Sequence, residues 1–201
     1  GVRLHPETAV TQRIAAECYA PNGASRILDA DGRIRKIVNN YSKISFNFGP
    51  TLLAWLEQEC PEVYQTILAA DQESQRRFSG HGSAMAQAYN HVILPLANDR
   101  DKRTQVLWGI RDFERRFHRR PEGLWMPETA VDLETIGILA ALGIRFTVLS
   151  PYQASKVRPV GGHAWKDVSG GRVDPSMAYR IRSRSGSSLA VFFYDGPIAR
   201  A

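Results

Sequence analysis

The apolar residues between positions 124 and 149 recur with two different periods. An apolar run at 124–126 is followed by residues at the spacing of one helix face, namely Leu133, Ile136, Leu139 and Ala140. Asp132 is placed to cap that helix and Gly143 to end it, and a second apolar run occupies 144–149. The pattern therefore predicts a strand, a helix and a second strand, the βαβ unit of parallel sheets.

The rest of the chain divides into strands and helices without an internal repeat or a linker. Pro50 and Pro61 open predicted helices that run through Leu56 and Leu68. Further helices are predicted at 72–78 and 104–117, and strands at 34–38, 44–48, 178–182 and 188–194. Residues 153–175 are rich in Gly, Pro, Lys and Arg and predict an excursion from the sheet. We therefore predict a single α/β domain of 201 residues with a mainly parallel sheet.

Composition and charge favour an enzyme domain over a nucleic-acid or membrane protein. The chain is 43% hydrophobic, enough for one core, and has 26 Lys and Arg against 20 Asp and Glu, a net charge of +6. Many arginines lie on the predicted helix at 104–117 opposite an apolar stripe, which indicates a solvated face. Cys18 and Cys60 give no disulfide framework, and no apolar run of about 18 residues occurs. We expect a cytoplasmic protein that binds neither nucleic acid nor membranes.

Glu128 is the strongest candidate for a catalytic side chain. It follows the predicted strand directly after Pro127, and Trp125 precedes it by three positions. A strand end holds a carboxylate rigidly, and an indole ring offers a flat apolar surface to a sugar. Retaining glycosidases use such a carboxylate as nucleophile, with a second carboxyl group about 5 Å away. The alternatives are an ion-paired or surface glutamate and a tryptophan of the core.

Several ordered segments resemble the glycoside hydrolases of family 57. They are the Trp-x-Pro-Glu-x-Ala segment at 125–130, the Gly-Ile-Arg-Phe strand at 143–146, the strand and helix start at 45–53, the Tyr-x-His-x-Ile-Leu-Pro-Leu segment at 89–96, and Ala16-Glu17-Cys18-Tyr19-Ala20-Pro21-Asn22, which is typical of one bacterial branch. The resemblance covers residues 16–201. It implies a retaining enzyme that acts on α-glucans by double displacement and is built on an incomplete (β/α)7 barrel.

The resemblance also implies a partial barrel that is truncated at both ends. The Asp-Gly-Glu-type motif that carries the family's acid/base aspartate has no match before Ala201. The family's early histidine-containing strand is unmatched too, because His5-Pro6-Glu7 lacks its spacing. We therefore expect the acid/base beyond Ala201 and an isolated fragment that is inactive on natural glucans.

The resemblance assigns Glu128 as the nucleophile and places His91 in the sugar-binding site nearest the cleaved bond. From its neighbours alone, His91 beside an apolar run is more typical of a core histidine. Asp195 follows the predicted strand at 188–194 and is a substrate-binding candidate, with a turn residue as the alternative. His81 lies between glycines, which permit either a close ligand or a tight turn. Trp125 completes the candidates as a sugar-stacking residue.

Two other functions stay open on the sequence alone. A polysaccharide-deacetylase-like barrel enzyme needs an aspartate and paired histidines for a metal ion, yet His81 and His91 are ten residues apart. A catalytically inactive carbohydrate-binding homologue would lack the second carboxylate. Phosphate-loop and Gly-x-Ser-x-Gly motifs do not occur. We expect a polysaccharide or oligosaccharide substrate and neither a metal ion nor an organic cofactor.

Overall fold

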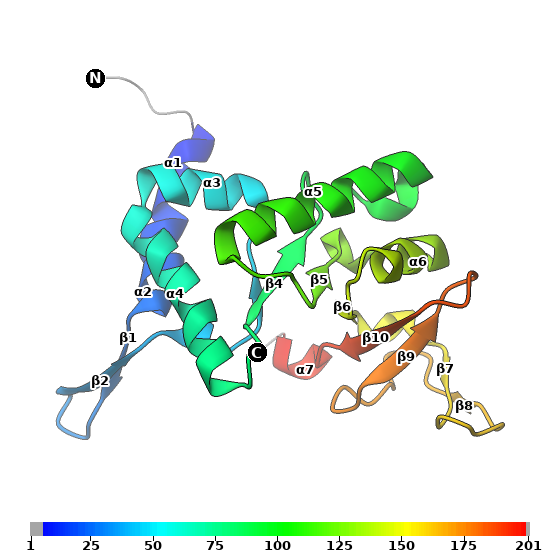
Figure 1. Cartoon of the computed structure of the whole chain (residues 1–201). Helices are drawn as coiled ribbons and strands as arrows, with labels where there is room; N and C mark the ends of the chain where they lie inside the picture. The colour runs from blue at the N-terminus through cyan, green and yellow to red at the C-terminus, as the bar shows by residue number, and fades with distance from the viewer. Residues whose placement is uncertain (1–5, 200–201) are drawn as a thin grey trace.

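The computed structural model describes residues 6–199, and Figure 1 shows their arrangement. The described part begins with α1 (Pro6–Ile14), a π-helical turn (Ala15–Tyr19) and α2 (Ala20–Gly23). A hairpin of β1 (Ser25–Leu28) and β2 (Ile34–Val38) follows and projects from the body, with most of its residues exposed. The strand predicted at 34–38 is confirmed, whereas β1 lies outside the predicted strands.

Six strands form one open layer in the order β3-β4-β5-β6-β10-β9. They are β3 (Phe46–Asn47), β4 (Ala84–Gln87), β5 (Leu124–Trp125), β6 (Phe146–Leu149), β9 (Tyr179–Arg182) and β10 (Ser188–Phe193). Only β9 is antiparallel to its neighbour, and a parallel bridge between Gly123 and Phe146 joins the two halves. The mainly parallel α/β sheet is therefore confirmed. Within residues 6–199 the layer stays open at β3 and β9 and forms no closed barrel.

Helices cover this layer, and short turns connect the strands to the helices. The helices are α3 (Pro50–Glu59), α4 (Pro61–Arg77), α5 (Asp99–Phe117), α6 (Leu133–Ala141) and α7 (Gly196–Ala199). Single 3-10 turns lie at Asn40–Ser42, Leu94–Leu96, Pro127–Thr129 and Pro151–Gln153, and the predicted excursion holds a small hairpin of β7 (Lys156–Val157) and β8 (Lys166–Asp167). None of the helices in the described part of the chain has the length and apolar character that a membrane span requires.

The helix predictions are confirmed with one exception. α3 begins at Pro50 as predicted, and α5 contains the helix predicted at 104–117 but begins earlier, at Asp99. The prediction of two separate helices between 61 and 78 is wrong, because one continuous helix, α4, spans this region. Ala70 and Asp71 lie between the two predicted segments and are buried. Their burial against the rest of the protein stabilises the helix at this point.

The βαβ unit around Glu128 forms as predicted. Asp132 caps α6 by accepting a hydrogen bond from the N–H of Thr135 at 2.7 Å, and Gly143 follows the helix with a φ of 85°. Leu124 of β5 and Leu139 of α6 are fully buried in the same core. This packing fixes both ends of the segment that carries Glu128.

β4 is the middle strand of the parallel group β3-β4-β5 and lies outside the predicted strands. Its four residues are all buried, with β3 and β5 on its two sides. Gly109 of α5 faces its end, where a Cβ atom would lie 1.9 Å from the carbonyl oxygen of Gln87. The segment Ala84-Met85-Ala86-Gln87 has no β-branched residue, so its extended form depends on tertiary contacts and not on local preference.

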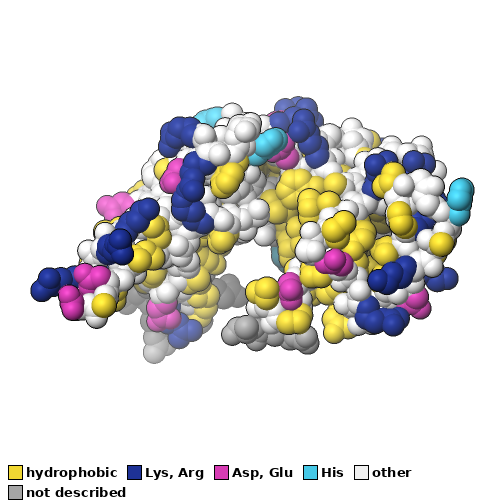
Figure 2. All heavy atoms as spheres, turned by 90° about the horizontal axis from the view of Figure 1, so that it is seen from below, with side chains coloured by type: hydrophobic (Ala, Val, Ile, Leu, Met, Phe, Trp, Pro, Cys, Tyr) yellow, Lys and Arg dark blue, Asp and Glu magenta, His cyan; other side chains and the backbone are white. Residues whose placement is uncertain are grey.

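The open layer leaves apolar side chains uncovered. Exposed large hydrophobic residues include Phe78, Phe192 and Ile198. Figure 2 shows hydrophobic side chains gathered around a hollow on the face seen from below. Uncovered apolar surface of this kind is typical of regions that contact ligands or other protein segments.

Candidate active site

Four polar side chains form a hydrogen-bonded chain along the carboxyl-terminal edge of β3, β4 and β5. Asn47 ends β3 and Gln87 ends β4, and Asn47 Nδ2 donates to Gln87 Oε1 at 2.9 Å. Gln87 Nε2 donates to His91 Nδ1, and His91 Nε2 donates to Glu128 Oε1 at 3.2 Å. Because the carboxyl ends of parallel strands meet at one edge, three successive strands contribute to one cluster. This is the edge at which α/β sheets bind their ligands.

Glu128 lies in the short 3-10 turn after β5, on a backbone that few side chains adopt. Its φ is 55° and its ψ is 20°, and the next residue, Thr129, has a φ of 53°. Met126 and Pro127 are buried beneath the turn, while the side chain of Glu128 is 73% exposed. Such conformations cost about 1–3 kcal/mol each and are concentrated at functional sites. The turn therefore presents the carboxylate to the solvent from a rigid base.

His91 is fixed by its loop and not by the core. Its φ is 55°, and its side chain is 54% exposed. The preceding N–H groups of Tyr89 and Asn90 donate to the carbonyl oxygen and to Oε1 of Gln105 in α5, at 3.1 Å and 2.8 Å. His91 is therefore not a core histidine, and its imidazole is accessible next to Glu128.

Trp125 and Asp195 lie on the same edge of the sheet. Trp125 is half-buried in β5, opposite Gln87 in the register. Asp195 follows β10, and its Oδ1 accepts a hydrogen bond from the N–H of Ile198 at 3.2 Å. Among the hydrogen bonds of residues 6–199, none joins Asp195 to Glu128. The structure thus brings Asp195 to the predicted edge without placing it in the chain of four.

Asp195 lines a small cavity that a hydrogen bond connects to the Glu128 turn. The cavity has a volume of about 230 Å³ and is lined by Pro151, Tyr152, Gly171, Val173, Pro175, Tyr194, Asp195, Gly196 and Pro197. Gln153, the neighbour of Tyr152, donates from Nε2 to the carbonyl oxygen of Thr129 at 2.8 Å. This hydrogen bond links one wall of the cavity to the residue after Glu128.

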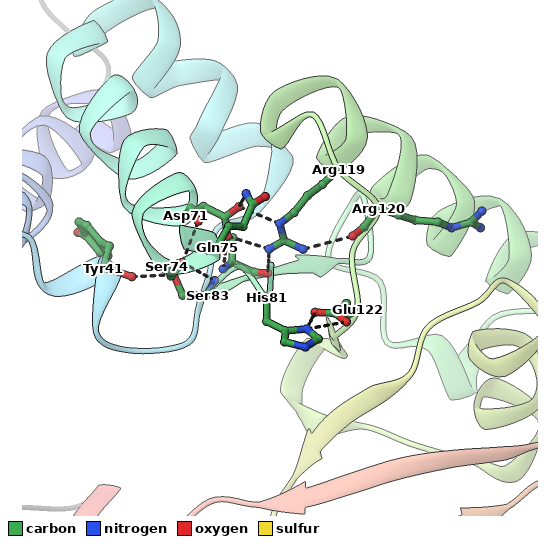
Figure 3. Close-up of polar contacts among 10 residues, drawn as sticks. Tyr41, Asp71, Ser74, Gln75, His81, Ser83, Arg119, Arg120 and Glu122 are labelled. Carbon is green, nitrogen blue, oxygen red and sulfur yellow. Dashed lines mark hydrogen bonds and ion pairs between the residues drawn. The ribbon is translucent and has the colours of Figure 1, made fainter. Parts of the chain in front are cut away.

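His81 lies at the opposite edge of the sheet. It precedes β4, and its Nδ1 is 2.9 Å and 3.1 Å from the two carboxylate oxygens of Glu122, which precedes β5. Glu122 also accepts a hydrogen bond from Arg145 at 2.9 Å. Figure 3 shows His81 and Glu122 side by side. The structure therefore does not bring His81 to the cluster around Glu128, because the strands separate their amino ends from their carboxyl ends.

A buried ion pair fixes the amino end of β4 near His81 (Figure 3). Asp71 of α4 is 1% exposed and accepts hydrogen bonds from Arg119 Nε and Nη2 at 2.8 Å and 2.7 Å. Arg119 also donates to the carbonyl oxygen of Ala84, whose N–H donates to Asp71. All partners are hydrogen-bonded, as buried charges require, so we interpret this network as structural.

Buried Lys102 of α5 holds the start of α6 beside the Glu128 turn. Its Nζ donates to Asp132 at 2.9 Å and also to Glu134. Burial opposes the charge on Lys102, but hydrogen bonds to Glu134 and Asp132 raise its pKa above the ordinary value. Burial also opposes the charge on Asp132, but hydrogen bonds from Thr135 and Lys102 lower its pKa below the ordinary value. Both groups therefore stay charged at neutral pH.

Asn47 and Gln87 belong to the cluster but not to the site predicted from the sequence. A single amide at a strand end has no distinctive spacing, so no motif marks either residue. The one available signal is that Gln87 interrupts a segment of small and apolar residues, Ala84-Met85-Ala86 before it and Ala88 after it. Within residues 6–199, no cluster of three or more His, Cys, Asp or Glu side chains is arranged to hold a metal ion.

The model of the family "Glycosyl hydrolase family 57" matches residues 8–200. The chain belongs to glycosyl hydrolase family 57. This member of the family is similar to Alpha-amylase 1 of Dictyoglomus thermophilum, with 26% identity over 149 residues. The match covers 74% of the chain but only 19% of the amylase, so the chain spans about a fifth of that relative.

Several solved structures share the fold of this family 57 chain. The 4-alpha-glucanotransferase of Thermococcus litoralis is 18% identical with a TM-score of 0.58, over 80% of the chain and 23% of the transferase. A protein of Mycobacterium smegmatis that is described as a polysaccharide deacetylase is 16% identical with a TM-score of 0.55, over 95% of the chain and 50% of that protein. At this identity the likeness shows the fold alone.

Proposed function

We propose that the protein is a retaining glycoside hydrolase or transglycosylase that acts on α-glucans, with Glu128 as its nucleophile. The observation that carries the proposal is the placement of the Glu128 carboxylate. It stands exposed on a strained turn at the carboxyl-terminal edge of the sheet, and one of its oxygens accepts a hydrogen bond from His91. Membership of glycosyl hydrolase family 57 supports a carbohydrate substrate.

The reaction proceeds by two displacements at the anomeric carbon. In the first, a Glu128 oxygen bonds to that carbon while the bond to the departing glycosidic oxygen breaks. A carboxylic acid must protonate the departing oxygen, and we assign no residue of this chain to that step. In the second, water or a sugar hydroxyl attacks the same carbon, passes its proton to the base that the acid of the first step has become, and releases Glu128 as a carboxylate. Water gives hydrolysis and a sugar hydroxyl gives transfer, the two activities named for the amylase and the glucanotransferase.

The residues around Glu128 supply the sugar contacts of the proposed site. His91 donates to the nucleophile and stands half-exposed where a sugar bound at Glu128 would lie. The half-buried indole of Trp125 provides a stacking surface, and Asp195 in the adjoining cavity provides an acceptor for a neighbouring sugar unit. His81 is not part of this site, because it lies at the opposite edge of the sheet.

Glu128→Gln in the full-length protein tests the nucleophile. We expect kcat on α-glucans to fall by about 10³-fold or more while glucan binding is retained, since the amide keeps the shape and loses the nucleophile. Glu62→Gln is the matched control, because Glu62 is exposed in the first turn of α4. A Glu128→Gln variant that keeps activity within tenfold of the control refutes the assignment.

Chemical rescue distinguishes a nucleophile from a general base. In Glu128→Ala, azide should enter the vacated space and attack an activated aryl α-glucoside, which forms a glycosyl azide of inverted configuration. The product is identified by NMR. A rescued product that retains its configuration, or rescue that forms no glycosyl azide, contradicts a covalent role for Glu128.

A metal-dependent deacetylase-like enzyme is the alternative that the likeness to the Mycobacterium smegmatis protein keeps open. Metal content after exhaustive dialysis and acetate release from an acetylated polysaccharide test it. Stoichiometric metal together with acetate release would replace the glycosidase proposal. Tight glucan binding without any turnover by the unmodified full-length protein would indicate an inactive carbohydrate-binding homologue.

A further inference from the structure

Gln87 is a buried amide in a strand that otherwise contains small and apolar residues. It is 7% exposed, and Ala84, Met85, Ala86 and Ala88 around it are buried as well. A buried amide is costly unless its polar atoms are hydrogen-bonded. Both ends of this amide have partners: Oε1 accepts from Asn47, and Nε2 donates to His91. A leucine or methionine would fill the same space without that requirement, so the amide itself has a role.

The direction of these hydrogen bonds determines where His91 carries its proton. Because Asn47 donates to Oε1, the Nε2 of Gln87 is the atom that faces His91. A nitrogen that accepts a hydrogen bond carries no proton, so Nδ1 of the neutral imidazole is bare and Nε2 is protonated. Nε2 then donates to Glu128 Oε1 at 3.2 Å.

We propose that Gln87 is a positioning residue that holds His91 in the Nε2–H tautomer, with Asn47 fixing the orientation of the Gln87 amide. The consequence for catalysis rests on the proposed function of Glu128. With a proton on Nε2, His91 stabilises the carboxylate form of Glu128, which is the form that attacks. With a bare Nε2, the lone pair of His91 Nε2 and that of the Glu128 oxygen would repel each other unless Glu128 took up a proton and donated it to Nε2. A protonated carboxyl group is no nucleophile.

The geometry separates this role from ordinary packing. His91 is half-exposed on a left-handed backbone, so the core does not dictate the orientation of its ring. The groups in hydrogen-bond contact with the ring are Gln87 on one nitrogen and Glu128 on the other. The backbone of Gly109 in α5 packs directly against the Gln87 carbonyl oxygen, and this contact keeps the end of β4 in place.

Asn47→Asp tests the proposal without altering His91, Gln87 or Glu128. The new carboxylate accepts hydrogen bonds only, so the Gln87 amide must turn and present Oε1 to His91, which moves the imidazole proton to Nδ1. Two-bond ¹H–¹⁵N spectra of histidine-labelled protein, recorded above the ordinary histidine pKa of about 6.5, report which nitrogen is protonated. We expect Nε2–H in the unmodified chain and Nδ1–H in Asn47→Asp, with kcat/KM in the full-length protein lowered at least tenfold.

Gln72→Glu is the matched control. It makes the same change from amide to carboxylate at an exposed position of α4, and it should leave the His91 spectrum unchanged. If Asn47→Asp fails to fold, Gln87→Glu replaces it. The carboxylate of the new glutamate accepts a hydrogen bond from His91 Nδ1, so both ring nitrogens should be protonated at a pH where the unmodified protein has a neutral His91 ring. An unmodified protein with Nδ1–H, or a His91 tautomer that neither variant changes, overturns the proposal. An Nε2–H tautomer combined with an active Glu128→Gln variant would overturn the proposed function and leave this inference standing.

Discussion

His91 and Glu128 contact each other from two strained backbones. Both have a φ of 55°, and non-glycine residues keep this conformation only where the surrounding contacts impose it. For His91 these contacts are the hydrogen bonds of its loop to Gln105, and for Glu128 they are the buried residues at the base of its turn. The backbone therefore aims the two side chains at one another, while both stay exposed.

Replacing His91 should impair the reaction far more than the fold. We expect His91→Ala to lower kcat/KM of the full-length enzyme by about 10²-fold, which corresponds to about 2.7 kcal/mol of transition-state stabilisation. The loss of stability should be small because the side chain is half-exposed. Steady-state kinetics and thermal unfolding of the same preparation measure both quantities.

His163→Ala is the control for this variant, because His163 is exposed in the loop between β7 and β8. It should change neither measurement. A His91→Ala protein that unfolds at a much lower temperature, yet turns over normally in its folded fraction, would show that His91 serves the fold and not the site.

Single residues differ in how far the sequence reveals them. Glu128 and His91 can be named as candidates from the sequence because each lies in a segment with recognisable neighbours. Asn47 and Gln87 were not, because their role depends on two strand ends that meet only in the folded sheet. His81 shows the converse: its glycine neighbours indicate a loop but cannot tell which edge of the sheet that loop occupies.

At the scale of elements, α5 determines where β4 ends. Gly109 lies so close to Gln87 that a methyl group has no room, with 1.9 Å between the added Cβ and the carbonyl oxygen. Gly137 of α6 is the matched glycine, because an added Cβ would lie 3.4 Å from Ser183 Cβ, at the limit of an ordinary van der Waals contact. The two helices thus offer the same substitution with a severe clash and with a close but ordinary contact.

Gly109→Ala should destabilise the protein by about 1–3 kcal/mol or more, because the helix must move away from β4. Gly137→Ala should be neutral or slightly stabilising, since alanine favours the helix over glycine by about 1 kcal/mol. Urea unfolding of both variants measures the difference. Equal stabilities would mean that α5 and β4 are not in the close contact described.

The link between α5 and α6 gives stability a dependence on pH. Asp132 has a lowered pKa in the folded protein, so its charge contributes stability at pH values above its unfolded pKa, and that contribution is lost as the pH falls through the folded value. Asp132→Asn keeps the cap of α6 but removes the charge that faces Lys102. We expect this variant to be less stable than the unmodified protein at neutral pH, with a difference that shrinks below about pH 4.

Unfolding free energies between pH 3 and 7 test this expectation. Asp31→Asn, in the exposed turn between β1 and β2, is the control and should show no such trend. A stability difference that is independent of pH would mean that the Asp132 charge does not stabilise the junction.

The sequence predicts an element best where that element carries its own signals. The helix at 133–141 carries its cap, its apolar face and its terminating glycine in its own sequence. β4 carries no such signal, because its extended form is imposed by β3, β5 and α5. The same tertiary contacts join the two predicted helices into α4. Local patterns therefore predict elements that stabilise themselves and miss those that their neighbours stabilise.

At the scale of the whole molecule, the sheet assigns different roles to its two edges. The carboxyl-terminal edge carries the strained turn, the accessible carboxylate and the cavity beside Asp195. The amino-terminal edge carries the buried Asp71–Arg119 pair and the His81–Glu122 contact, next to the left-handed backbones of Ser79 and His118. The exposed carboxylate thus lies at one edge and the buried ion pair at the other, which is the division expected where catalysis and stability occupy opposite ends of parallel strands.

The proposed chemistry predicts how the 201-residue chain alone depends on its substrate. Glu128 can attack the anomeric carbon, but no residue of this chain is assigned to protonate the leaving oxygen, a contribution of about 10²–10⁴-fold. The dinitrophenolate of a dinitrophenyl α-glucoside leaves without being protonated, so we expect slow release of this phenolate, and Glu128→Gln should abolish it. Starch and glycogen should be inert. Phenolate absorbance and reducing-sugar assays measure the two reactions. Turnover of starch at rates typical of enzymes would place an acid within these residues, with Asp195 the first candidate because it lies on the same edge of the sheet as Glu128.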